Sequence, residues 1–82
     1  MHTGMLWFDS SQTPFNVKIE KAVNYYVKKY GRQPDLVLVH PIMLEKNQRQ
    51  FKINEGKPNE LTVRPYRPVL PGHIWIGIED KN

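Results

Sequence analysis

The sequence predicts an α+β fold: one amphipathic helix packed on a mixed β-sheet of about four to five strands, in the order β-α-β-β-β. Three observations lead to this prediction. Apolar side chains recur every three or four residues between positions 15 and 30, as on the buried face of a helix. The run Leu36–Val39 contains no polar residue, as in a central strand buried on both faces. Elsewhere, short apolar or alternating segments bounded by turn residues indicate the other strands.

The chain has the size and composition of one small globular domain. Its 82 residues are 39% hydrophobic and 24% charged, and we expect a single domain over 1–82 with flexible ends at 1–4 and 80–82. There is no cysteine, which excludes disulfides and Cys-based zinc sites and fits a reducing cytoplasm. No apolar run approaches the roughly 20 residues that span a bilayer, and the first residues lack the pattern of a signal peptide. We therefore expect a cytoplasmic protein with no membrane partner.

The first half of the chain carries the clearest local signals. Met5–Phe8 is an apolar strand segment that ends in turn residues. Thr13 offers an N-cap hydroxyl, and Pro14 follows at the first helical position, where a missing N–H costs nothing. Gly31 ends the helix in the left-handed conformation. The spacing places these residues on the buried helix face: Phe15, Ile19, Ala22, Val23, Tyr26 and Tyr30.

The second half indicates three further strands, which follow the buried strand after one helical turn or a loop. The segments 48–54 and 60–66 predict an antiparallel hairpin with a loop of about five residues. The last strand, 73–79, directs three isoleucines to one face and Trp75 to the other. Prolines at positions 65, 68 and 71 predict a rigid, extended connection between the last two strands.

The balance of helices and strands predicts a partner. One helix can cover only one face of a sheet, yet Leu36–Val39 indicates burial on both faces. The second face must be covered by a curled hairpin, by the proline-rich segment or by another subunit. We therefore expect a homodimer or another protein partner. The candidate interface residues are Trp75, Tyr66 and Arg67, because aromatic and arginine side chains are enriched at protein interfaces.

Asp9 and His40 are the candidates for a ligand site at one edge of the sheet. In a βαβ unit the two strands point the same way, so these residues end at the same edge, where ligands of open α/β sheets bind. A carboxylate beside an imidazole is the basis of general base catalysis. The simpler interpretation is that Asp9 belongs to a turn and that His40 ends a strand. No nucleophile-elbow glycines flank Ser10 and Ser11, and the three histidines are scattered, so we assign no catalytic residue, metal or cofactor.

The outer helix face is the candidate for binding nucleic acid. A stripe of cations interleaved with an aromatic ring follows helical spacing, and the chain has a net charge of +4. The stripe consists of Lys18, Lys21, Tyr25, Lys28 and Arg32. Contacts through it would go mainly to phosphates, and the affinity would fall steeply with salt. The alternative interpretation is a solvated, lysine-rich helix face with no partner.

No motif in the sequence is diagnostic of a reaction. We expect a non-enzymatic protein-interaction or binding module that acts as a homodimer or in a larger assembly. The alternative is a weak, sequence-nonspecific nucleic-acid-binding protein that uses the Lys/Tyr face of its helix.

Overall fold

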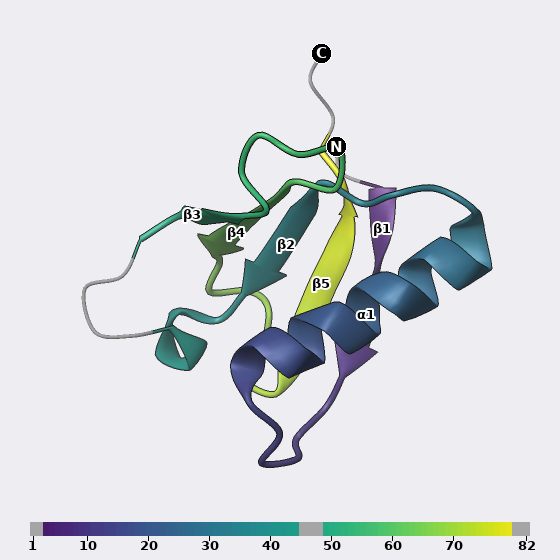
Figure 1. Cartoon of the computed structure of the whole chain (residues 1–82). Helices are drawn as coiled ribbons and strands as arrows, with labels where there is room; N and C mark the ends of the chain where they lie inside the picture. Colours follow the sequence, from purple (N-terminus) through teal and green to yellow (C-terminus); the bar gives the residue numbers. More distant parts are fainter. Residues whose placement is uncertain (1–2, 45–48, 80–82) are drawn as a thin grey trace.

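A computed structural model describes residues 3–44 and 49–79, and it shows one helix packed on one face of a five-stranded mixed sheet (Figure 1). The elements are β1 (Thr3–Phe8), α1 (Phe15–Tyr30), β2 (Leu36–Val39), the 3₁₀ turn η1 (Pro41–Met43), β3 (Phe51–Ile53), β4 (Leu61–Pro65) and β5 (His73–Ile78). The predicted α+β class and the order β-α-β-β-β are confirmed.

The sheet has the strand order β1-β5-β2-β4-β3. β2 runs parallel to β4, whereas β5 is antiparallel to both β1 and β2, and β3 is antiparallel to β4. β2 therefore occupies the centre, and all four of its residues are buried, as the unbroken apolar run predicts. β1 and β2 run in the same direction, but β5 lies between them, so they are not neighbours.

Helix α1 begins one residue later than its sequence predicts. The residue before the helix is Pro14, which has an extended backbone (φ −54°, ψ 147°). Its side chain makes no capping hydrogen bond to the first turn of the helix. The hydroxyl of Thr13 instead accepts a hydrogen bond from the hydroxyl of Ser11 at 2.8 Å. The other end is as predicted: Gly31 is left-handed (φ 71°), and its N–H donates to the carbonyl of Val27 at 2.8 Å.

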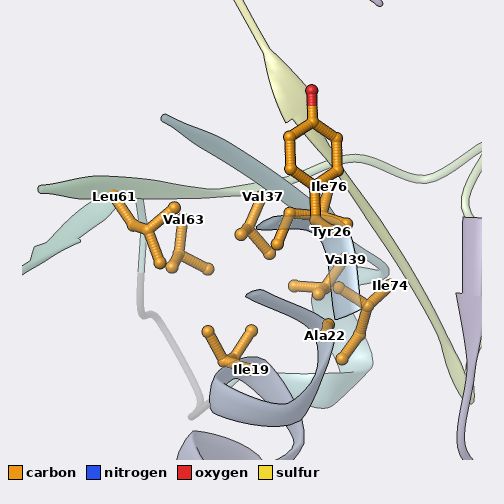
Figure 2. Packing of buried hydrophobic residues seen from close by; sticks show 9 residues of the cluster. All are labelled: Ile19, Ala22, Tyr26, Val37, Val39, Leu61, Val63, Ile74 and Ile76. Atoms are coloured by element: carbon orange, nitrogen blue, oxygen red, sulfur yellow. The ribbon is translucent and has the colours of Figure 1, made fainter. Parts of the chain in front are cut away.

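The main core lies between α1 and the sheet (Figure 2). Its fully buried members are Ile19, Ala22, Tyr26, Val37, Val39, Leu61, Val63, Ile74 and Ile76. Burying an aliphatic side chain contributes about 1.5–3 kcal/mol, so this cluster is the main source of stability. Burial also raises the pKa of Tyr26, because a low-dielectric setting disfavours the phenolate. Tyr30, at the end of the helix, stays 46% exposed and contacts the Tyr26 ring at a centroid distance of 4.7 Å.

One prediction, about the proline-rich connection, is wrong, and the expected flexibility of the chain ends stays a prediction. β1 begins at Thr3, which pairs with Ile78, so residues 3–4 of the expected lead-in are paired in the sheet. Residues 1–2 and 80–82 lie outside the described residues. The proline-rich segment is not extended: the N–H of Val69 donates to the carbonyl of Tyr66, and a second turn ends at His73. β4 and β5 lie only two strand spacings apart, about 10 Å, so seven extended residues would overshoot the gap.

The predicted hairpin is confirmed, with shorter strands and a longer loop. β3 and β4 pair antiparallel, with Ile53 opposite Leu61, and the loop spans 54–60. The first residue of the expected strand, at 48, lies outside the described residues. After β2 the chain makes one 3₁₀ turn, one of the two forms that the sequence left open.

Candidate functional site

The face of the sheet that points away from α1 is the candidate interaction surface, and we call it the second face. Side chains alternate along each strand, so residues out of step with the core point to this side. Trp75 lies near its centre, because it is opposite Leu6 on β1 and opposite Leu38 on β2. Next to that row, Phe8 is paired with His73, and their rings lie 4.8 Å apart.

The proline-rich connection covers part of the second face. Val69 forms a small buried cluster with Leu36 and Leu38, and Trp75 packs against it. Of the three possible covers that the sequence leaves open, this segment is therefore one that the chain uses. The cover is incomplete: Leu6 is 58% exposed, Phe8 61%, Leu70 64% and Tyr66 47%.

Two hollows flank Val69 on this face, with volumes of about 420 and 310 Å³. Both are lined by Tyr66, Val69 and Trp75. The larger hollow adds Leu38 and Arg64, and the smaller adds Leu6, Pro68, Leu70 and His73. The lining is thus mainly apolar and aromatic, the composition found at the buried centres of protein interfaces.

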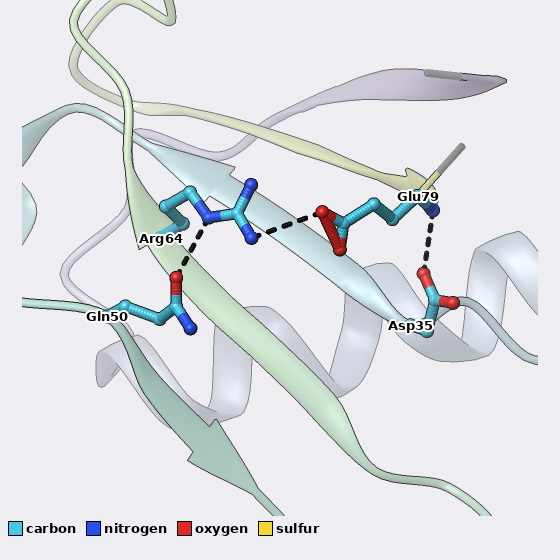
Figure 3. A network of polar contacts seen from close by, with 4 residues as sticks. All are labelled: Asp35, Gln50, Arg64 and Glu79. Atoms are coloured by element: carbon cyan, nitrogen blue, oxygen red, sulfur yellow. Dashed lines mark hydrogen bonds and ion pairs between the residues drawn. The ribbon is translucent and has the colours of Figure 1, made fainter. Parts of the chain in front are cut away.

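A polar network borders the larger hollow (Figure 3). The guanidinium of Arg64 donates to the side chain of Gln50 at 3.0 Å and to the carboxylate of Glu79 at 3.3 Å. The backbone N–H of Glu79 donates in turn to Asp35 at 2.8 Å. The Arg64–Glu79 pair is about one-third exposed, so it contributes little to stability. Its effect is to hold the Arg64 side chain beside the apolar surface.

The position of Trp75 depends on a glycine in the edge strand. A Cβ atom added to Gly4 would lie 2.6 Å from Cζ2 of Trp75 and would also overlap the carbonyl of Ile76. The indole therefore lies across β1 at the one residue of that strand that has no side chain. A larger residue here would move the ring that lines both hollows.

The two interface candidates Trp75 and Tyr66 thus come together on the second face, and Arg67 lies exposed in the adjoining turn. Leu6, Phe8 and Leu70 were missed by the sequence reasoning. A signal for the first two existed: four consecutive apolar residues in β1 place side chains on both faces of the sheet.

Asp9 and His40 do lie at one edge of the sheet, but the structure does not join them. Their strands are parallel and β5 separates them, which places them about 10 Å apart across the sheet. Asp9 accepts the N–H of Ser11 at 2.9 Å, and hydrogen bonding first with the Ser11 side chain and then with this N–H lowers the pKa of Asp9. Nδ1 of His40 accepts the N–H of Ile42 at 3.1 Å. Each residue therefore caps a local turn, as the simpler interpretation has it.

Four of the five residues of the predicted helix stripe are exposed, and Lys18 is not. Lys18 is only 8% exposed, and its amine donates to the backbone carbonyl of Asp9 at 2.9 Å, so its expected place on the outer face is wrong. Its aliphatic stem packs while its amine holds the β1–α1 connection. The other four members lie on the surface, and the ring of Tyr25 contacts that of Trp7 at 5.2 Å.

Comparisons with known proteins do not place the chain in a family. It matches no protein-family model, and no curated protein and no solved structure is significantly similar to it. Within residues 3–44 and 49–79, no three histidine, aspartate or glutamate side chains group as metal ligands, and His2 lies outside these ranges. Within the same ranges, no helix has the length and apolar character to cross a bilayer.

Proposed function

We propose that this protein is a non-enzymatic interaction module that buries its second face against another protein, in the first place against a second copy of itself. The observation that carries the proposal is the group of large apolar side chains left exposed on that face. Leu6, Phe8 and Leu70 are each more than half exposed. Leu6 and Leu70 line a hollow together with aromatic rings, and the ring of Phe8 contacts His73 in the same lining. Contiguous apolar surface of this kind marks interaction sites on small proteins.

A dimer interface of standard size would take a modest share of the surface of this chain. A stable interface buries about 800 Å² on each partner, which is about one-seventh of the 5777 Å² accessible surface of this chain. The part of the face that the 66–72 connection leaves uncovered would pack against the same part of the second copy, side chain against side chain. Residues that protrude beside hollows, such as Leu70 and Leu6, are suited to that arrangement.

Sedimentation velocity over a wide concentration range tests the proposal. The expected result is a shift of the sedimentation coefficient from monomer to dimer as the concentration rises from about 1 to 500 µM. A protein that stays monomeric at the highest concentration would overturn self-association through this face.

The helix stripe supports the alternative function, binding of nucleic acid. Lys21, Lys28 and Arg32 are exposed, and none forms an ion pair with another described residue. Binding through them would be nonspecific and salt-dependent. Titration with single- and double-stranded nucleic acid at two salt concentrations tests it, with Lys21→Glu plus Lys28→Glu as the variant. Absence of binding at low salt, or binding unchanged in the variant, would dismiss this function.

A further inference from the structure

A cleft of about 490 Å³ lies on the helix side of the sheet, opposite the second face, between α1 and the β3–β4 hairpin. Its apolar lining comes from Ile19 and Val23 of the helix and from Ile53 and Leu61 of the hairpin. The volume is within the range of sites that hold small ligands or a few residues of a peptide.

The walls of this cleft carry an unusual concentration of carboxamide side chains. Asn16, Glu20 and Asn24 recur every four residues, which places them in one line along the helix. Asn54 and Asn59 face them from the hairpin loop, and Gln33 follows the helix end. None of these five amide side chains hydrogen-bonds to another described residue. Each can donate two hydrogen bonds and accept two, so the cleft contains both donors and acceptors that are available to a ligand.

The charged and aromatic residues of the lining restrict the class of ligand that the cleft can bind. The sequence has 12 lysines and arginines, yet among residues 3–44 and 49–79 none lines the cleft, and Glu20 is the one charged side chain of the described lining. A phosphate or another anion would therefore meet no compensating cation there. The described lining residues include no aromatic ring either, so they offer a nucleobase no stacking surface. What remains is neutral hydrogen bonding, an aliphatic floor and one carboxylate.

We propose that the cleft binds an extended peptide segment that carries a lysine or arginine next to an aliphatic residue. A carboxamide offers the same donor and acceptor as a peptide group, so amides on two walls can pair with the N–H and C=O groups of a bound chain. Alternate side chains of an extended peptide point to opposite sides, so one enters the apolar floor while its neighbours face Glu20 and solvent.

Side-chain amide signals in a ¹⁵N-correlated NMR spectrum report on this site directly. The probe is a short, capped peptide of alternating lysine and valine, and the matched probe has glutamate in place of lysine. We expect the signals of Asn16, Asn24 and Asn54 to shift on titration with the lysine peptide, with about fivefold weaker binding or none for the glutamate peptide. Absence of shifts with the lysine peptide at millimolar concentration would overturn the proposal. Shifts caused only by a disaccharide or a nucleotide would overturn it as well.

Three variants sharpen the test. Asn54 has a left-handed backbone (φ 57°), which glycine adopts without strain, so Asn54→Gly removes one amide and leaves the turn intact. This variant should bind the lysine peptide about fivefold more weakly, which is the effect of losing one neutral hydrogen bond. Glu20→Gln should abolish the preference for lysine over glutamate. Gln12→Ala, which removes an exposed amide outside the cleft, should change nothing. Equal effects of Gln12→Ala and Asn54→Gly would contradict the assignment.

Discussion

Replacing Leu6 by serine tests whether the second face carries self-association. The side chain is 58% exposed, and complete burial of a leucine contributes about 1.5–3 kcal/mol. Covering its exposed part therefore contributes about 1–1.5 kcal/mol per copy. A symmetric dimer contains the residue twice, so Leu6→Ser should weaken dimerisation by about 2–3 kcal/mol. That corresponds to a dissociation constant raised about 30- to 150-fold.

The assay is sedimentation equilibrium of the wild type and two variants, with thermal unfolding of each as the check on folding. Ile42→Ser is the matched control, because Ile42 is 72% exposed but lies in the 3₁₀ turn and lines neither hollow of the second face. It should leave the dissociation constant unchanged within about twofold. Both variants should melt within a few degrees of the wild type, since substitutions at exposed positions change the free energy of unfolding by about 0.5 kcal/mol. Equal dissociation constants for wild type and Leu6→Ser would refute the reasoning.

Three further predictions concern stability. Gly4→Ala should destabilise the fold by about 1–3 kcal/mol, because the new methyl group overlaps the Ile76 carbonyl and crowds Trp75; a variant that melts at the wild-type temperature would contradict this close approach. Lys18→Met keeps the buried stem but removes the donor to the Asp9 carbonyl, so it should lower the free energy of unfolding, measured by chemical denaturation, by about 1–3 kcal/mol. At the exposed position 21, Lys21→Met should lower it by less than about 0.5 kcal/mol. Equal stabilities of the two variants would contradict the buried position of Lys18. Burial raises the pKa of Tyr26 above its ordinary value of 10.0, so above that pH the unfolded chain releases a proton that the folded chain keeps, and stability falls. Tyr26→Phe should therefore lose less stability than the wild type between about pH 9 and pH 11, and an equal loss would mean that this phenol is not protected.

The sequence was sufficient to predict the elements whose structure depends on residues close together in the chain. The left-handed Gly31 and the unbroken run of β2 each depend on neighbours within a few residues, and each is found as predicted. The helix spacing holds as well, except that Tyr30, in the last turn, is exposed. The hairpin of β3 and β4 is also a local pairing, and only its loop length differs. The class and order of elements follow from these signals together.

Long-range pairing decided what the sequence could not show. β5, the last strand of the chain, inserts between β1 and β2, and this insertion is what separates Asp9 from His40. This position of β5 leaves residues 66–72 only two strand spacings to cover, so the proline-rich segment folds into turns and brings Val69 onto the second face. Lys18 has the composition of a surface residue, but its long stem packs and its amine reaches a carbonyl.

Intermolecular nuclear Overhauser effects test the central claim most directly. In a mixed sample of ¹³C-labelled and unlabelled protein at high concentration, filtered spectra report only contacts between copies. We predict contacts from Leu6, Phe8 and Leu70 of one copy to aromatic protons of the other, because these side chains surround the exposed part of the second face. Contacts that arise only from the helix surface, or no contacts at all, would contradict the claim that this face is where the protein binds its partner.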